Sequence, residues 1–315
     1  MNRKEESMRI AYGQALEALA EEFPFAVMDA DLSKATQTCR FAESYPNRFF
    51  NMGICEANMM AAAAGFASCG STVIASTFAV FAAGRAYEPI RQMIGHTGLN
   101  VKICATHAGV LIGPDGATHQ AMEDIALMRV IPGMTVLSPS DAQSVKPLLA
   151  LALRRRGPVY MRLARLATPA VYDDALRPAF QAGGSSLLRT GGDAALLATG
   201  QMVPVALEAA EKLATCGIQA AVVDMYSIKP IDAERILRCA CETGRIITLE
   251  DHSVIGGLGS AVSEVLCENR PVPLKRIGIP DVFGTSGNVQ ELADYFNLHA
   301  DAVKKTVMDF CAKHI

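Results

Sequence analysis

Short apolar runs alternate with longer helical patterns along the whole chain. The runs are nearly continuous rather than alternating, as expected for strands that are buried on both faces of a sheet. We predict strands at 24–31, 71–77, 101–107, 134–140, 158–164, 193–200, 219–228, 245–252 and 273–279. Helical patterns lie between them, for example at 54–69, 78–94, 140–155 and 203–216. This alternation predicts an α/β fold in which mostly parallel sheets are flanked by helices.

The strands fall into two groups, separated by a stretch without any sustained period. Residues 168–192 contain two prolines, four glycines and mixed charges, a composition typical of a connection between domains. The chain has 315 residues, a length that also favours two domains. We therefore predict a first domain at 1–172, a linker at 173–190 and a second domain at 191–315.

Composition excludes several classes of function. The net charge of −3 gives no reason to expect a nucleic acid or an anionic membrane as a partner. The nine cysteines are irregularly spaced and include no CxxC pair, so we expect reduced thiols and no metal site. The N-terminal MNRKEESMRI lacks an apolar signal region, and the apolar stretches stop short of membrane-spanning length. These features predict a cytoplasmic location.

Glu56 is the first candidate for chemistry. It stands in GICEANMMAAAAGF, at the start of a predicted helix that is otherwise Met, Ala, Cys and Gly. A helix with so few polar residues is expected to be buried. A carboxyl group that is buried can remain protonated near neutral pH. The simpler interpretation of this feature alone is a first-turn glutamate that interacts favourably with the helix dipole.

A second group of residues lies in THAGVLIGPDGATHQ (106–120). His107 ends an apolar strand, where open α/β sheets bind their ligands. The glycine-flanked turn that follows carries Asp115, and His119 is expected to begin the next helix. Two histidines and a carboxylate could exchange protons with a polyhydroxylated substrate. The alternative is a plain Asp-Gly turn followed by a helix cap.

Three further features are weaker. Arg162 and Arg165 flank the end of PVYMRLAR and would face opposite sides of an unbroken strand, so one at most should reach a given cleft. Phe78 and Phe81 could present one aromatic face to a flat ring, although core packing is the simpler explanation of this feature taken alone. The GGLGS at 256–260 resembles a nucleotide loop without matching its spacing, so we interpret it as close packing of a helix on a sheet.

Taken in order, these pieces resemble the transketolase family over nearly the whole chain, from the family's pyrimidine-binding domain to its end. The motifs that carry the resemblance are DADLS, MGICEANM, TFAVF, GPDGATHQ, RVIPGMTVLSPSDA and EDHSVIGGLGSAVSEVL. The resemblance implies thiamine diphosphate as the cofactor. Glu56 matches the catalytic glutamate that bonds the aminopyrimidine ring of this cofactor. Phe78 and Phe81 match the aromatic wall around that ring, and Asp31 matches an aspartate near the cofactor.

The resemblance also implies substrate contacts and catalytic histidines. His107 and Asp115 match residues that contact substrate hydroxyls, and His119 matches the histidine at the reactive end of the donor. Arg9 and Arg165 match arginines that grip the distal phosphate of sugar substrates.

Two departures from the family pattern put the identity of the sugar in doubt. Ala35 stands where a serine often supports the phosphate, and Gly84 stands where a tyrosine often completes the aromatic wall.

A larger departure concerns the partner. The family binds diphosphate and Mg²⁺ through a GDG motif in an N-terminal domain, and this chain contains no GDG. The resemblance therefore implies a split transketolase. A separate N-terminal subunit would hold the diphosphate and Mg²⁺, in an α₂β₂ assembly in which this chain also dimerises.

Related enzymes remain as alternatives. Deoxyxylulose-phosphate synthase shares a DG-x-TH loop but is normally one longer chain. The β subunit of 2-oxo-acid dehydrogenase E1 has the same two domains, although its loop usually lacks both histidines. A non-catalytic scaffold that kept the fold is a further alternative.

Overall fold

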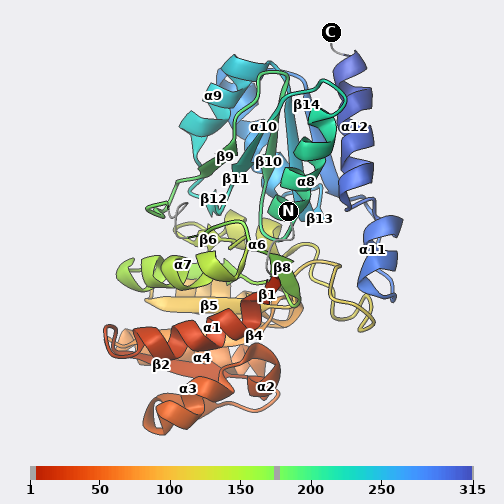
Figure 1. Cartoon of the computed structure of the whole chain (residues 1–315). Helices are drawn as coiled ribbons and strands as arrows, with labels where there is room; N and C mark the ends of the chain where they lie inside the picture. The colour runs from red at the N-terminus through yellow and green to blue at the C-terminus, as the bar shows by residue number, and fades with distance from the viewer. Residues whose placement is uncertain (1–4, 174–177, 314–315) are drawn as a thin grey trace.

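Two sheets, stacked one above the other, organise the chain (Figure 1). The computed structural model describes residues 5–173 and 178–313. The first sheet has the order β12-β6-β7-β5-β4-β2-β3, and the second has the order β14-β13-β10-β11-β9. All neighbouring strands are parallel except β12 beside β6 and β9 beside β11. A small antiparallel pair, β1 with β8, stands apart from both.

The strand bounds are as follows. The first sheet contains β2 (Phe25–Asp29), β3 (Phe49–Asn51), β4 (Thr72–Phe78), β5 (Val101–Thr106), β6 (Thr135–Leu137), β7 (Val159–Arg162) and β12 (Ser227–Lys229). The second contains β9 (Ser186–Arg189), β10 (Ala194–Ala198), β11 (Ala220–Asp224), β13 (Ile246–Ser253) and β14 (Leu274–Ile279). The antiparallel pair is β1 (Glu5–Ser7) and β8 (Ala167–Pro169).

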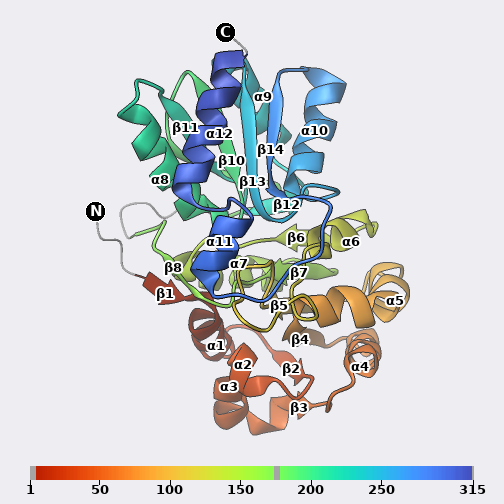
Figure 2. The ribbon, with the colours of Figure 1, turned by 90° about the vertical axis from the view of Figure 1, so that its right-hand side faces the viewer.

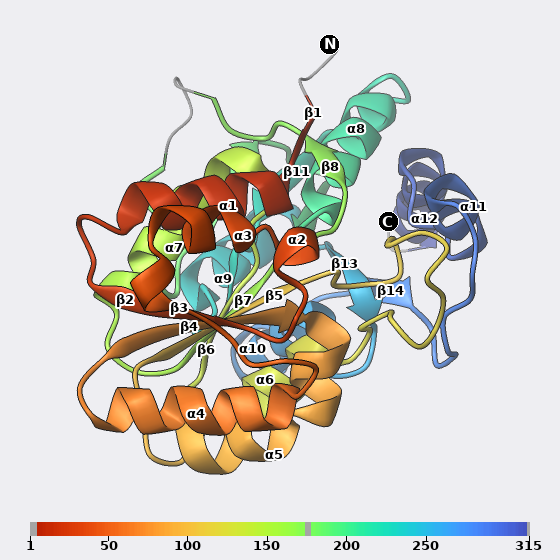
Figure 3. The ribbon, with the colours of Figure 1, turned by 90° about the horizontal axis from the view of Figure 1, so that it is seen from below.

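Helices cover both faces of the first sheet (Figure 3). One face carries α1 (Met8–Leu19), α2 (Ser33–Thr36), α3 (Cys39–Ser44), the 3₁₀ turn η1 (Pro46–Arg48) and α7 (Ala142–Arg154). The other carries α4 (Glu56–Ser68), the π-helical turns η2 (Phe81–Arg85) and η3 (Ile90–Gly95), α5 (Tyr87–Pro89) and α6 (Asp124–Val130). Alternate residues of β4 therefore enter different cores: Val73 and Ala75 pack toward α4, and Ile74 packs toward α1 and α7.

The second sheet is built in the same way (Figure 2). One face packs against α8 (Met202–Ala214), α11 (Val289–Tyr295) and α12 (Ala300–Lys313), and the other against α9 (Ala233–Thr243) and α10 (Leu258–Asn269). Along β10, Leu196 enters the first of these cores and Leu197 the second. Val110 and Leu111, from the loop after β5, also pack into the core beside α8, so the two units are joined by apolar contact.

The predicted α/β class is confirmed, and the structure corrects three details. The run 219–228 is not one strand, because β11 ends at Asp224 and β12 then joins the first sheet. The helical pattern predicted at 78–94 starts too early, because Phe78 ends β4, and residues 81–95 form two π-helical turns around a short α-helix. His119 does not begin a helix, because α6 starts at Asp124.

The expected linker at 173–190 contains β9, while residues 174–177 lie outside the described part of the chain. The domain limits stay a prediction. All nine cysteines are free thiols. Within the described ranges, every helix is too short or too polar to cross a membrane.

Candidate functional site

The candidate residues gather at one edge of the first sheet. Parallel strands end at the same edge, which is where open α/β sheets bind ligands. Phe78 is the last residue of β4, His107 directly follows β5, and Asp31 and Arg165 come shortly after β2 and β7. The order of the strands thus brings together side chains that are far apart in sequence.

Glu56 is the first residue of α4, and only 1% of its surface is exposed. Its Oε2 accepts a hydrogen bond from Arg85 Nη1 at 2.9 Å. The guanidinium of Arg85 also lies over the ring of Phe81, 4.7 Å from the ring centroid, while its side chain stays 53% exposed. A buried carboxylate requires a partner of this kind, and here the partner reaches in from the surface.

Two phenylalanines and two histidines form a continuous aromatic wall. The rings of Phe78 and Phe81 are stacked with centroids 5.7 Å apart, and His107 stacks on Phe78 at 3.7 Å. His119 meets Phe81 edge-on at 5.5 Å. Since Arg85 lies over Phe81 and bonds Glu56, the buried carboxylate, the aromatic rings and both histidines belong to one site.

His107 is electrostatically unusual. It has a left-handed backbone (φ 58°), is 3% exposed, and its Nδ1 lies 3.0 Å from the hydroxyl oxygen of Thr106. Burial, reinforced by the positive charges of Arg9 and Arg165, lowers the pKa of His107 to about 3. The ring is therefore neutral near pH 7, so it can either donate or accept a hydrogen bond.

The loop at residues 109–120, hereafter the GPDG loop, connects this wall to the arginines. Arg165 Nη1 donates to Asp115 Oδ2 at 2.9 Å and also to the carbonyl of Ile112. Arg9, in the first turn of α1, donates from Nε to the carbonyl of Arg165 at 2.7 Å and from Nη1 to that of Ala35 at 2.8 Å. The positive charges of both arginines act on His107, and binding of an anionic group would require positive charge of this kind.

Asp31 lies at the margin of this arrangement. It is exposed, has a left-handed backbone (φ 63°) and accepts a hydrogen bond from Asn51 at 2.9 Å. The buried carboxylate of the DADLS motif is instead Asp29, which accepts from the hydroxyls of Thr36 and Thr38 at 2.7 and 2.9 Å. Asp29 thus fixes the turn that carries Asp31.

Arg162 does not belong to the site. It is 4% exposed, and its Nε donates to Asp124 Oδ2 at 2.8 Å while its Nη2 donates to the carbonyl of Asp251 at 2.7 Å. Arg162 therefore links the two units, and Arg165 alone of the pair reaches the GPDG loop.

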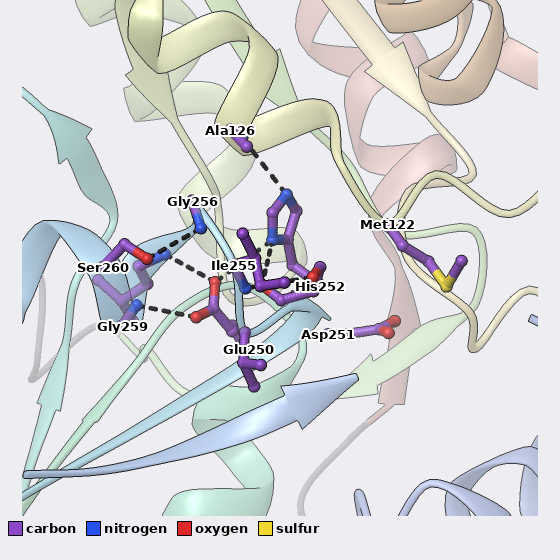
Figure 4. Close-up of polar contacts among 12 residues, drawn as sticks. Met122, Ala126, Glu250, Asp251, His252, Ile255, Gly256, Gly259 and Ser260 are labelled. Carbon is purple, nitrogen blue, oxygen red and sulfur yellow. Dashed lines mark hydrogen bonds and ion pairs between the residues drawn. The ribbon is translucent and has the colours of Figure 1, made fainter. Parts of the chain in front are cut away.

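The GGLGS segment packs on β13, as its sequence predicts (Figure 4). The carboxylate of Glu250 accepts hydrogen bonds from the backbone N–H groups of Leu258 and Gly259 at 2.6 and 2.8 Å. A Cβ atom at Gly257 would lie 2.0 Å from Glu250 Oε2 and 2.6 Å from His252 Nδ1. The glycines are needed for this close approach, so the interpretation as helix–sheet packing is confirmed.

The structure adds two polar residues that the sequence did not indicate. Arg85 follows Phe81 by one helical turn, a spacing that could have suggested its contact with the aromatic wall. Gln120 ends the GPDG loop and donates to the carbonyls of Val110 and Thr285. Its partner lies 165 residues away, so no local pattern could predict this contact.

The site fits the pyrimidine side of thiamine diphosphate. Glu56 offers a buried carboxyl group to a ring nitrogen, and Phe78 and Phe81 offer aromatic faces for a flat ring. Among the residues that the structure describes, no cluster of three or more His, Cys, Asp or Glu side chains could hold a metal ion.

Comparisons with known proteins agree with this geometry. Residues 4–170 match the family model of the transketolase pyrimidine-binding domain, and residues 183–303 match that of the transketolase C-terminal domain. The chain is 46% identical to a putative transketolase C-terminal section of Methanocaldococcus jannaschii, covering 96% of this chain and 95% of that protein. It is 43% identical to a 6-deoxy-6-sulfo-D-fructose transketolase subunit of a Clostridium species, covering 91% and 89%.

Solved structures and longer relatives complete the comparison. A structure described as a split-gene transketolase, an inactive β4 tetramer, is 48% identical to the chain with a TM-score of 0.91, covering 98% of this chain and 99% of that one. The 1-deoxy-D-xylulose-5-phosphate synthase of Pelotomaculum thermopropionicum is 36% identical over 95% of this chain, which matches only 47% of that enzyme. On the strength of two matching domain families and relatives that align over nearly its full length, the chain belongs to the transketolase family.

Proposed function

We propose that this chain is the C-terminal subunit of a split, thiamine-diphosphate-dependent transketolase that moves a two-carbon ketol unit between sugars. A separate N-terminal subunit would hold the diphosphate and Mg²⁺, and an α₂β₂ assembly, in which this chain also contacts its own copy, would complete the site. The observation that carries the proposal is Glu56, a buried carboxylate beside an aromatic wall and two histidines.

Each residue has a part in this proposal. Thiamine diphosphate, when bound, supplies the electron sink needed to cleave a carbon–carbon bond. Glu56 would hold a proton against a nitrogen of the aminopyrimidine ring, while Phe78 and Phe81 orient the ring and exclude water. The neutral His107 and Asp115 would bind the substrate hydroxyls, and His119, at the reactive end of the donor, would move a proton.

A Glu56→Gln variant tests the assignment. We expect ketol transfer by the complex with the partner subunit to fall at least about 100-fold, because the carboxyl proton is lost while the shape is kept. Subunit association, measured by sedimentation, should be unchanged. Glu43→Gln is the matched control, since Glu43 is an exposed residue of α3. Full activity of Glu56→Gln would favour the non-catalytic scaffold.

The arginines favour an anionic ketose donor. Arg9 and Arg165 lie beside His107, and a relative at 43% identity is named for a sulfonated fructose. We expect the complex to use 6-deoxy-6-sulfo-D-fructose or D-fructose 6-phosphate at least about tenfold better than D-fructose, judged by kcat/KM, since a charge-assisted hydrogen bond contributes roughly 1.5–3 kcal/mol. An Arg9→Gln variant should lose this preference and keep its rate with the neutral sugar.

The same complex can distinguish the alternatives by their products. A deoxyxylulose-phosphate-synthase-like or E1-type enzyme would release CO₂ from pyruvate or a branched 2-oxo acid. Ketol transfer without decarboxylation of these acids would support the transketolase assignment, and the reverse would overturn it.

A further inference from the structure

The second unit reaches the GPDG loop at both of its ends. In Figures 2 and 3 the segment between β14 and α11 runs beside the yellow loop after β5. We propose that this unit positions the loop for the reaction. Asp251 holds the start of the loop, and residues 281–287, hereafter the 281–287 segment, hold its end, so that Asp115 and His119 present a fixed geometry to the substrate. The inference rests on the proposed function.

Asp251, on β13, binds the start of the loop. Its carboxylate accepts hydrogen bonds from the backbone N–H groups of Val110 and Leu111 at 2.9 and 3.3 Å, and from the side chain of Gln201. Asp251 is 1% exposed. A Cβ atom at Gly109 (φ 86°) would lie 1.9 Å from Asp251 Oδ2, so this approach requires glycine. Two charge-assisted bonds to consecutive backbone groups leave this part of the loop little freedom to rotate.

Gln120 binds the other end. Its Nε2 donates to the carbonyl of Val110 at 3.1 Å, which closes the loop on itself, and to the carbonyl of Thr285 in the 281–287 segment at 2.9 Å. The backbone N–H of Gly109 also donates to the carbonyl of Ala121 at 2.9 Å. The side chain of Gln120 thus connects the two ends of the GPDG loop to each other and connects the loop to the second unit.

Close packing supports these bonds. A Cβ atom at Gly284 would lie 1.7 Å from Gln120 Oε1, and one at Gly116 would lie 2.5 Å from Ser286 Oγ. The 281–287 segment therefore rests directly on the loop, one residue from Asp115. These contacts are made to the loop that carries Asp115 and His119, the candidate substrate groups. Joining the two units would not by itself require contacts at this loop.

The loop is also held from the first unit. Asp115 pairs with Arg165 at 2.9 Å, and His119 packs edge-on against Phe81. Asp115 and His119 are therefore placed between two rigid supports. A small displacement of the second-unit support should move both groups relative to the substrate, and displacements of about 1 Å can cost about 100-fold in rate.

Two variants and one matched control test the proposal. Gly284→Ala places a methyl group where it clashes with the side chain of Gln120. Gln120→Met removes both hydrogen bonds that Gln120 donates and keeps a side chain of similar volume. Gly287→Ala is the control, because the three atoms nearest to a Cβ atom there belong to the side chains of Glu291 and Leu292, at 3.3–3.5 Å. The first measurement is hydrogen exchange of residues 109–120 in the isolated chain. We expect exchange at least about tenfold faster in both variants and unchanged in the control.

The second measurement uses the complex with the partner subunit, thiamine diphosphate, Mg²⁺ and D-fructose 6-phosphate as the donor. We expect both variants to raise the KM for the donor at least about fivefold while the Kd for thiamine diphosphate stays unchanged. Both variants should also lower the Tm, because one crowds a buried side chain and the other removes two buried hydrogen bonds. Faster exchange with an unchanged KM, or unchanged exchange, would overturn the positioning role. If the wild-type complex transfers no ketol unit, the proposed function fails, while the exchange measurement still decides whether the second unit restrains the loop.

Discussion

Asp224, at the end of β11, is a buried carboxyl group outside the candidate site. Its Oδ2 accepts hydrogen bonds from the hydroxyls of Tyr172 and Ser140 at 2.6 and 2.8 Å, and its Oδ1 is buried without a hydrogen-bond partner among the described residues. Burial raises the pKa of Asp224 to about 7. Between about pH 4 and pH 7 the unfolded chain loses this proton while the folded chain keeps it, so the contribution of Asp224 to stability falls as the pH rises through this window.

We therefore predict that Asp224→Asn stabilises the protein at pH 8 by about 4 kcal/mol and has little effect near pH 4, since the folded and unfolded pKa values differ by about three units and each unit corresponds to about 1.4 kcal/mol. Urea unfolding at both pH values measures the difference. Asp309→Asn, at an exposed position of α12, is the control. A stabilisation by Asp224→Asn that is equal at pH 4 and pH 8 would contradict the prediction.

Sequence could predict most of the side chains that gather in the site, because these follow the ends of parallel strands, whereas Arg9 lies in the first turn of α1. It could not predict their partners. The sequence predicts Glu56 at the start of a buried helix, but the contact of Glu56 with Arg85 depends on the π-helical turn of η2. The positions of Asp115 and His119 likewise depend on Gln120, whose partner Thr285 belongs to the other unit.

At the scale of elements, two helical glycines should respond in opposite ways to the same change. Gly259 is the second residue of α10, and a Cβ atom there would lie 2.8 Å from Thr248 Oγ1 and from the side chain of Arg276. A Cβ atom at Gly65, within α4, would meet nothing within 4 Å. We predict that Gly259→Ala destabilises the isolated chain by about 1–3 kcal/mol and that Gly65→Ala stabilises it by about 0.5–1 kcal/mol. Thermal unfolding checks both, and a shared sign would contradict the packing interpretation of GGLGS.

The apolar pattern predicted the main strands because their residues alternate between two cores, as in β4 and β10. The apolar pattern did not predict the limits of a strand where contacts between distant parts of the chain determine those limits. The run 219–228 is mostly apolar, yet β11 and β12 belong to different sheets because the chain passes from one unit to the other after Asp224. Asp224 is the one charged residue in this run, but a single polar residue does not distinguish the end of a strand from a polar position within it.

At the scale of the whole molecule, the stacking of the two units depends on buried polar contacts that no local pattern encodes. Arg162 joins Asp124 of the first unit to the backbone of Asp251 in the second, and the N–H of Ala126 donates to His252 Nε2 at 3.3 Å (Figure 4). The motif EDH is visible in the sequence, but its function in joining the units follows only from the arrangement of the two sheets.

This chain would supply only the pyrimidine side of the proposed cofactor site. Glu56 and the aromatic wall offer contacts to the aminopyrimidine ring alone, so we expect calorimetric titration with thiamine diphosphate and Mg²⁺ to give weak binding to the isolated chain. Tight binding is expected only after an N-terminal transketolase subunit is added. A Glu56→Ala chain in the same mixture should bind about tenfold more weakly, because one charge-assisted hydrogen bond is lost while the subunits still associate.

Each outcome of this titration has a separate meaning. Tight, Mg²⁺-dependent binding by the isolated chain would refute the split site, since the chain would then hold the diphosphate itself. Equal affinity of the wild-type and Glu56→Ala mixtures for thiamine diphosphate would be compatible with a cofactor site divided between two subunits. It would contradict the proposal that Glu56 contacts the cofactor. Because the measurement needs no turnover, it tests the division of the site between two subunits independently of which sugars the enzyme uses.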